Sequence, residues 1–271
     1  MFTGLSRYVI VWNMNISDRQ QITRETFTTN LVERVLEPEE VISGDEGKMY
    51  AIRVDDRTLI TKMLAFDIVE SLGLTRDSRL LEVGCGSGQL AFELSKYIQP
   101  QNIVATDGSP ELIESAKERY GKDGIVFEVE NVHEIKDKAN FDAVVCKDSL
   151  HHFPNPVVAI KELMAPLKIG GALYIFDLTR SALDSEIDQR QKDIINDHEA
   201  MRFLRSVNAS LTIEEFEQAA KQAGESNLII LHPVIFSNKN REIHSAEIEA
   251  NKNSEINLPT LSALYIIRKV S

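Results

Sequence analysis

The sequence predicts an α/β fold in which helices cover both faces of a doubly wound, mostly parallel sheet. One stretch, residues 80–97, runs from four residues of buried-strand type through three closely spaced glycines into an apolar, helix-forming segment. Similar strand-like and helix-like segments then alternate along the chain as far as residue 178. This alternation is typical of parallel sheets, because parallel strands need crossover connections between them.

Composition narrows the kinds of partner that the protein has. Its 271 residues are 43% hydrophobic, which is enough for a sizeable core, and 42 acidic residues against 30 basic ones give a net charge of −12. An acidic protein repels a phosphate backbone, so we expect no nucleic-acid partner. No apolar run approaches the ~18 residues of a membrane span, so we expect no membrane association.

The two cysteines, Cys85 and Cys146, lack the paired spacing of a disulfide framework or a zinc site. We therefore expect no structural metal and a reducing, cytoplasmic location.

Residues 1–56 are expected to form an N-terminal arm and a cap helix. The helix is predicted over residues 17–37, because Ser17 begins a capping-box pattern and Pro38 follows the apolar stripe. Residues 39–48 are acidic and contain glycine, which predicts a mobile loop.

The main domain is expected at residues 57–271, beginning with a largely buried helix over residues 57–72. The predicted strands are short apolar runs bounded by polar or glycine-containing turns. There are seven of them, at residues 80–83, 103–107, 125–129, 141–146, 172–178, 227–236 and 260–270.

The predicted helices have recognisable ends. Ser109 as N-cap and Pro110 at the first helical position open a helix that runs to residue 120. A further helix is expected at residues 157–167. Near the C-terminal end of the domain, a capping box at Thr212 opens a helix that Gly224 closes.

Two segments are longer than simple connections require. Residues 179–224 contain a charged, helix-compatible insert, which we expect to form a helical lid on the substrate side. Residues 237–259 are polar and are predicted to be a flexible excursion or an interface arm. An exposed sheet edge and such an arm make a homodimer possible.

The glycine turn is a candidate nucleotide site. Glycines allow backbone conformations closed to other residues, and they let a ligand lie against the main chain near a helix N-terminus. The dinucleotide fingerprint G-x-G-x-x-G is not met, because Gln89 stands where its last glycine is needed after Gly84 and Gly86. The sequence therefore disfavours a nicotinamide dinucleotide.

Asp107 ends the second predicted strand, about 20 residues after the turn. A carboxylate at this place is well positioned to accept hydrogen bonds from ribose hydroxyls.

The sequences EVGCGSG at residues 82–88 and VATD at residues 104–107 resemble the first two motifs of class I S-adenosylmethionine-dependent methyltransferases. LHHFPNP at residues 150–156 resembles the loop after the fourth strand in small-molecule members of that family. The resemblance covers residues 58–178 closely. It implies a Rossmann-like fold whose last strand is reversed, and methyl transfer from S-adenosylmethionine to an oxygen, nitrogen or carbon atom of a small molecule, with S-adenosylhomocysteine as the product.

The resemblance also implies roles for individual residues. Glu82 is expected near the methionine ammonium, Asp107 on the ribose, and Asn131 with the next backbone amide on the adenine. The full set of expected cofactor contacts is Glu82, Gly84, Cys85, Gly86, Gly88, Asp107, Gly108, Asn131, Val132 and Lys147. No metal ligand is expected.

His151 is the candidate catalytic residue, as a general base on a hydroxyl or an amine, because imidazole titrates near neutral pH. His152 is the lesser candidate. Since adjacent residues on a helical turn point in different directions, we expect one of the two to be buried structure.

Two other classes of function stay open. In the first, the chain binds the cofactor as a non-catalytic partner or regulatory subunit. In the second, it is a nicotinamide oxidoreductase with an altered glycine turn.

Overall fold

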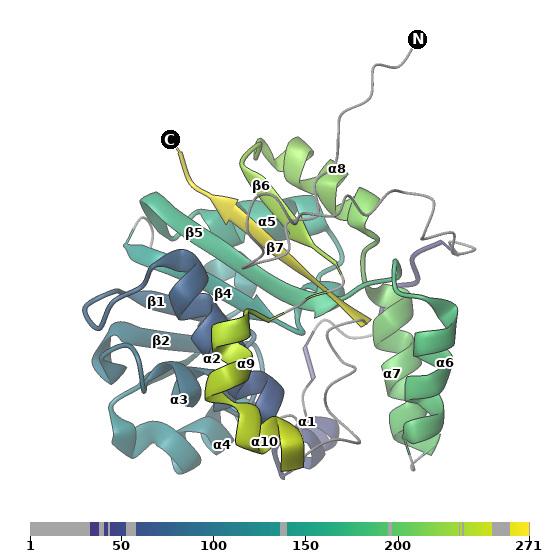
Figure 1. Ribbon diagram of the computed structural model, residues 1–271, viewed down its shortest axis with the longest axis horizontal. Helices are drawn as coiled ribbons and strands as arrows, with labels where there is room; N and C mark the ends of the chain where they lie inside the picture. The colour runs from purple at the N-terminus through teal and green to yellow at the C-terminus, as the bar shows by residue number, and fades with distance from the viewer. Residues whose placement is uncertain are drawn as a thin grey trace.

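The computed structural model of the protein describes residues 33–37, 41–42, 44–52, 58–135, 140–194, 197–232, 234, 236–250 and 261–270. Its centre is a seven-stranded sheet with the order β3-β2-β1-β4-β5-β7-β6 (Figure 1). The strands are β1 Leu80–Val83, β2 Ile103–Asp107, β3 Val126–Val129, β4 Phe141–Lys147, β5 Leu167–Leu178, β6 Leu228–Leu231 and β7 Ser262–Arg268. Pairs among β1 to β5 are parallel, and β7 runs antiparallel to both β5 and β6. The predicted fold class, including the reversed last strand, is confirmed.

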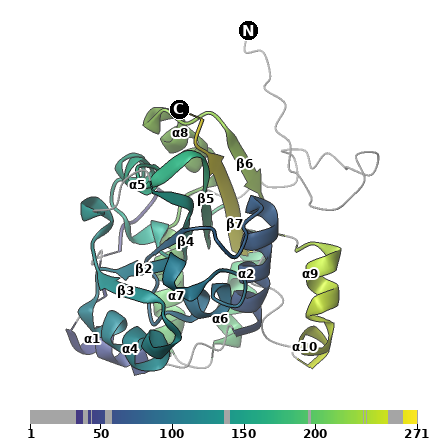
Figure 2. The same cartoon turned by 90° about the vertical axis from the view of Figure 1, so that its left-hand side faces the viewer.

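The central strands are largely apolar and buried, because both faces of the sheet are covered. Every residue of β1 is buried, whereas the edge strand β3 leaves Val126 and Val129 exposed. One core lies under α2 Thr58–Leu72 and α3 Gln89–Leu94, and a second lies under α5 Pro156–Met164 and α8 Ile213–Ala223. Figure 2 shows α5 and α2 on opposite sides of the sheet.

The predicted helix ends are present in the structure. The Ser109 hydroxyl accepts the N–H of Leu112 at the start of α4 Pro110–Tyr120. Thr212 and Glu215 form the expected capping box of α8, and Gly224 closes that helix with a φ of 98°. Such a left-handed residue after a helix favours glycine, which lacks the Cβ that would be strained there.

The N-terminal predictions are only partly testable and are wrong where they are tested. Residues 17–32 of the predicted helix lie outside the described residues, and residues 33–37 are not helical. Val35 and Leu36, expected on the buried stripe, are 58% and 49% exposed. The predicted mobile loop at residues 39–48 is instead the site where a helix begins.

That helix, α1 Gly44–Ile52, is held by tertiary contacts. The N–H of Gly44 donates to the Glu111 carboxylate at 3.0 Å, which ties the start of α1 to α4. Arg202 of the later helix α7 Asp197–Ala209 lies over the Tyr50 ring, with its guanidinium carbon 5.1 Å from the ring centroid. The sequence GDEGKMYAI has weak helix propensity, so these contacts explain why the pattern alone missed α1.

The predicted lid insert divides into two parts. α6 Asp184–Asp193 and α7 Asp197–Ala209 form a pair that stands beside the sheet (Figure 1). α8 belongs to the layer over the sheet, where Phe216 stacks on Tyr265 at 3.7 Å between ring centroids. The part of the insert that can act as a lid is therefore narrower than residues 179–224.

Of the two predictions for residues 237–259, the flexible excursion is wrong for the first half of the range, and the interface arm stays a prediction. α9 Asn238–Ile243 and α10 Ser245–Ala250 form there and lie beside α2 (Figure 1). The side-chain amide of the buried Asn240 donates to the carbonyl of Met63 at 2.8 Å. Residues 251–260 lie outside the described residues. In the part of the chain that the structure describes, no helix is long and apolar enough to cross a membrane.

Candidate functional site

The candidate site lies at the carboxyl ends of β1, β2 and β4, where the strand order reverses. In open α/β sheets this is the edge at which ligands bind. The turn after β1 carries Gly84, Gly86 and Gly88, with φ values of 73°, 54° and 83°. All three lie in the left-handed region, so the backbone of this turn requires glycine.

The surroundings distinguish these three glycines from one another. A Cβ on Gly84 would lie 2.2 Å from the Ser149 hydroxyl oxygen, and a Cβ on Gly88 would lie 2.8 Å from the Phe127 ring. A Cβ on Gly86 would meet nothing within 4 Å. Gly84 and Gly88 are thus explained by packing, whereas Gly86 faces space into which a ligand can reach the main chain.

Asp107 connects the ends of two strands. Its Oδ2 accepts the N–H of Gly86 at 2.9 Å, and its Oδ1 accepts the N–H of Ser109 at 2.9 Å. Burial raises the pKa of this carboxyl, and the two hydrogen bonds act in the opposite direction. Because a carboxylate oxygen has two lone pairs, each oxygen retains one acceptor position for a ligand hydroxyl.

Glu82 is a buried carboxyl inside β1, with 2% of its surface exposed. In the described part of the chain its Oε2 has no hydrogen-bond partner. Burial raises the pKa of Glu82 to about 8, while the nearby Lys147 lowers it and Asp107 raises it further. A buried acceptor without a partner is costly, so this oxygen is suited to a ligand that brings a donor.

The end of β4 carries a strained residue that the sequence analysis did not single out. Asp148 has a φ of 49°, and among the described residues it is the one non-glycine residue with positive φ. Its carboxylate pairs with Nζ of Lys147 at 2.7 Å. Strain of this kind persists where the surroundings fix the backbone, which is common at functional sites. The Lys147 side chain is engaged here, which leaves its backbone as the predicted contact.

Three further residues predicted to contact the cofactor also have roles in the fold. The amide oxygen of Asn131 accepts the N–H of His133 at 2.9 Å and so caps a short turn, although a second lone pair remains. Gly108 lies against Val41, whose methyl carbon would be 2.8 Å from a Cβ at this position. Val132 is buried in the second core.

Cys85 is buried in the first core, and burial raises the pKa of its thiol well above the usual range. Its backbone N–H donates to the carbonyl of Thr106. The side chain is therefore a packing element, and any ligand contact at this residue comes from the main chain.

His151 is paired with an acid at the end of the neighbouring strand. Its Nδ1 lies 2.6 Å from Oδ1 of Asp177, and its backbone N–H donates to Oδ2 at 3.0 Å. Both side chains are buried. Burial lowers the pKa of His151, but Asp177, with Asp148 and Glu37, acts in the opposite direction, and the net direction is upward. The sequence signal for Asp177 was a lone carboxylate closing the apolar run ALYIF.

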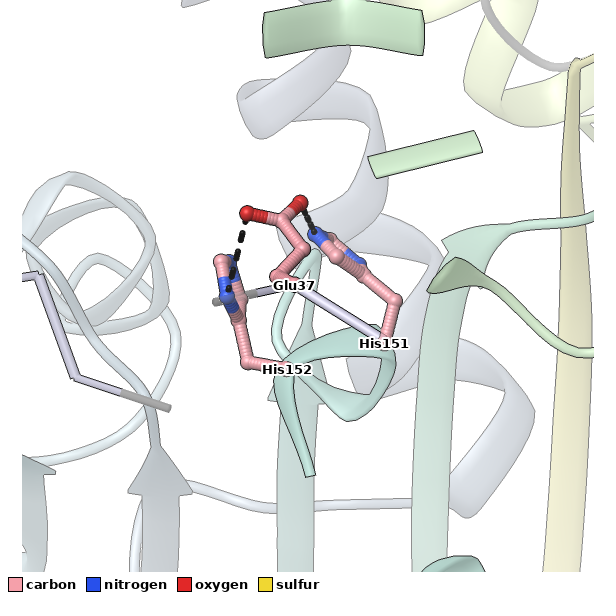
Figure 3. A group of neighbouring side chains, drawn as sticks. All are labelled: Glu37, His151 and His152. Atoms are coloured by element: carbon pink, nitrogen blue, oxygen red, sulfur yellow. Dashed lines mark ion pairs between the residues drawn. The ribbon is translucent and has the colours of Figure 1, made fainter. Parts of the chain in front are cut away.

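One of the two histidines, His151, is buried as expected, but the prediction that their side chains point in different directions is wrong. Their ring centroids are 4.3 Å apart, and both rings face Glu37 (Figure 3). Glu37 Oε1 is 4.0 Å from His151 Nε2, and Glu37 Oε2 is 3.8 Å from His152 Nδ1. The reason is that Asp177 turns the His151 ring, which brings Nε2 to the same side as His152.

This histidine pair lies next to the glycine turn. The hydroxyl of Ser149, two residues before His151, donates to the carbonyl of Gly84 at 3.3 Å. The β4 loop and the β1 turn therefore form one continuous site.

Comparisons with known proteins agree on the kind of domain. Residues 81–175 match the family model described as a methyltransferase domain. The ubiquinone biosynthesis O-methyltransferases of Xanthomonas axonopodis pv. citri and Xanthomonas euvesicatoria pv. vesicatoria are 32% and 31% identical to this chain over 108 residues. Each alignment covers 38% of this chain and 44% of the relative, so the chain spans less than half the length of these curated relatives.

Solved structures show the same fold over most of the chain. The plantazolicin methyltransferase BpumL in complex with SAH has a TM-score of 0.60 at 21% identity, covering 79% of this chain and 86% of that one. The related BamL, bound to a triazolic desmethylPZN analog and SAH, has a TM-score of 0.60 at 21% identity, covering 84% and 88%. The Rossmann-like methyltransferase fold is thus confirmed.

Proposed function

We propose that this protein transfers a methyl group from S-adenosylmethionine to an oxygen, nitrogen or carbon atom of a small-molecule acceptor. The observation that carries the proposal is the arrangement of Glu82, Gly86 and Asp107 at one edge of the sheet. Glu82 provides a buried carboxyl oxygen without a hydrogen-bond donor, Gly86 provides an open stretch of main chain, and Asp107 provides further acceptor positions.

These groups fit the parts of S-adenosylmethionine. The cofactor supplies an electrophilic methyl group on a sulfonium, together with an ammonium and a ribose diol that need acceptors. Glu82 accepts a hydrogen bond from the ammonium, and Asp107 accepts from the ribose hydroxyls. Gly86 lets the cofactor lie close to the protein backbone. Asn131 and the backbone of Val132 are proposed for the adenine, and the backbones of Gly84, Cys85, Gly88, Gly108 and Lys147 shape the remaining wall.

The protein's contribution to methyl transfer is mainly alignment and exclusion of water, because an in-line displacement needs little covalent help. The strained Asp148 and the rigid glycine turn fix the two sides of the site. α7 lies against the turn of residues 150–152 and α6 packs on α7, so this pair is proposed as the lid over the acceptor.

His151 is proposed as the general base at the acceptor end. Asp177 holds its Nδ1 side, so that Nε2 is the nitrogen available to take a proton from a hydroxyl or an amine. The names of the curated relatives, both O-methyltransferases of ubiquinone biosynthesis, favour a hydroxyl over the other acceptors. A homodimer stays a prediction.

Calorimetric titration with S-adenosylmethionine, S-adenosylhomocysteine and NADH tests the cofactor. We expect the first two to bind the protein and NADH not to bind, and we expect the Glu82→Gln variant to lose most of this affinity. The variant Glu118→Gln, on the exposed side of α4, is the matched control and should bind as the wild type does.

Binding of NADH alone would reject the proposal in favour of an oxidoreductase. If the cofactor binds but no labelled methyl group reaches any acceptor in fractionated small-molecule extracts, the protein is the non-catalytic binding partner instead.

A further inference from the structure

We propose that Glu37, His151 and His152 together bind a divalent transition-metal ion, of which Zn²⁺ is the type. One ligand atom from each residue lies within 4.8 Å of the others (Figure 3). The three residues come from two segments far apart in the sequence, the strip of residues 33–37 and the turn of residues 150–152. No metal was expected from the sequence, because its two cysteines lack the paired spacing of a zinc site.

The ligand set suits such an ion chemically. Two imidazoles and one carboxylate are the ligands of many zinc and iron sites that keep a further coordination position open. Hard ions such as Mg²⁺ prefer oxygen ligands and are poorly served by two nitrogens. The proposal is therefore specific to transition metals.

The distances leave room for an ion and do not suit direct hydrogen bonds. Glu37 oxygens lie 4.0 and 3.8 Å from the two ring nitrogens, beyond the ~3.2 Å limit of a good hydrogen bond. Ligand atoms about 2.0–2.2 Å from an ion in tetrahedral geometry lie about 3.4 Å from each other. Small side-chain rotations would bring the three ligand atoms to that spacing.

The surroundings orient the ligands. Asp177 accepts from Nδ1 of His151 at 2.6 Å, which fixes the tautomer whose Nε2 lone pair points to Glu37. The hydroxyl of Ser206 donates to Oε1 of Glu37 at 2.7 Å. A carboxylate behind a ligating histidine is the usual arrangement around a bound metal.

Arg34 holds the strip that carries Glu37 in place. Its Nη2 donates to the carbonyl of Phe153 at 2.9 Å, and its Nε donates to the carbonyl of Ala209 at 2.7 Å. The Glu37 and His152 side chains are 16% and 15% exposed, so an ion can enter from solvent. The cluster is thus held from outside and open on one side.

A bound ion coordinates the lone pair of His151 Nε2, so this nitrogen can no longer accept a proton. The ion's charge then favours loss of a proton from an acceptor hydroxyl nearby, in place of direct removal by His151. This consequence depends on the proposed methyl transfer, whereas binding of the ion does not. If no ion binds, the base role of His151 stands.

The test is titration of the chelator-treated protein of 271 residues with Co²⁺, followed by visible absorption, because cobalt in a low-coordinate nitrogen and oxygen site gives strong bands. We expect one equivalent to bind, to be displaced by Zn²⁺ and not to be displaced by a large excess of Mg²⁺. The Glu37→Gln variant should bind at least 100-fold more weakly, and Asp177→Asn 10- to 100-fold more weakly.

Two controls make the result interpretable. Glu33→Gln changes an exposed acid on the same strip, and His133→Asn removes an exposed histidine elsewhere. Neither change should alter cobalt binding. Thermal unfolding without metal shows whether each variant is folded, and Zn²⁺ should raise the Tm of the wild type but not of Glu37→Gln.

Absence of cobalt binding at 1:1 stoichiometry, or binding that Glu37→Gln leaves unchanged, overturns the inference. S-adenosylmethionine titration of the same chelator-treated protein keeps the two proposals apart, since the proposed cofactor contacts include none of the three proposed metal ligands.

Discussion

Oδ2 of Asp107 accepts the backbone N–H of Gly86 at 2.9 Å, so the acid that ends β2 fixes the turn that ends β1. The residue expected to bind the ribose therefore also builds the surface against which the rest of the ligand lies. Loss of this acid should affect both the folded state and the binding of ligand.

Asp107→Ala is expected to lower the free energy of unfolding by at least about 2 kcal/mol, because it leaves the N–H groups of Gly86 and Ser109 without their acceptor. Cofactor affinity should fall at least tenfold. Asp107→Asn retains one acceptor oxygen and should lie between the alanine variant and the wild type. Urea denaturation and calorimetry measure the two effects. Asp123→Asn, at an exposed position, is the control, and an alanine variant as stable as the wild type would contradict the structure.

The glycines of the turn should separate stability from binding. Gly86→Ala adds a methyl group that meets no protein atom, at a conformational cost of about 1–2 kcal/mol, and should abolish cofactor binding in a folded protein. Gly88→Ala places a methyl group against Phe127 and should instead lower the Tm severely. Circular dichroism with calorimetry distinguishes them. The interpretation fails if the two variants behave alike.

Glu82 predicts an unusual dependence of stability on pH. Its pKa is near 4.5 in the unfolded chain and about 8 in the folded protein, so the folded state favours the protonated form. As the pH rises above 4.5, Glu82 ionises in the unfolded chain but stays protonated in the folded protein. The free energy of unfolding therefore falls until the pH reaches about 8. Since one pKa unit is worth about 1.4 kcal/mol, this decrease is at most about 5 kcal/mol.

Glu82→Gln should therefore be more stable than the wild type at pH 9 and little different at pH 4, although it binds cofactor poorly. Urea denaturation between these pH values measures the difference. If the free energies of unfolding of the variant and the wild type differ by the same amount at every pH, ionisation of Glu82 does not destabilise the folded protein.

Arg34 should control the attachment of the N-terminal strip. Its guanidinium donates to the carbonyls of Phe153 and Ala209, from two different segments. In Arg34→Met, we expect protease to cleave within residues 33–37 at least tenfold faster than in the wild type, while the sheet stays folded. Arg76→Met, on an exposed turn, is the control. Equal cleavage rates in the two variants would mean that these bonds do not hold the strip.

The sheet and the glycine turn were predictable because their signals are local. Residues 80–94 contain a strand, a turn and a helix in direct succession, and the capping box of Thr212 spans only one turn. Local patterns of this kind record backbone geometry directly.

The acceptor end was not predictable in the same way. Asp177 meets His151 only because β5 pairs with β4, and Glu37 reaches the histidines only because Arg34 docks its segment on the β4 loop. The helix α1 was missed because Glu111 stabilises it from another element. Contacts between distant segments leave no periodicity in the sequence.

The position of β7 has a consequence for the order of folding during synthesis. β6 pairs with β7 and β7 pairs with β5, so β6 joins the sheet only through a strand made after it. Until residues 262–268 have left the ribosome, β5 has an open edge and β6 has no strand with which to pair. A nascent chain therefore already carries the glycine turn and Asp107 on paired strands, while Asp177 still lies on an exposed strand that a chaperone can bind.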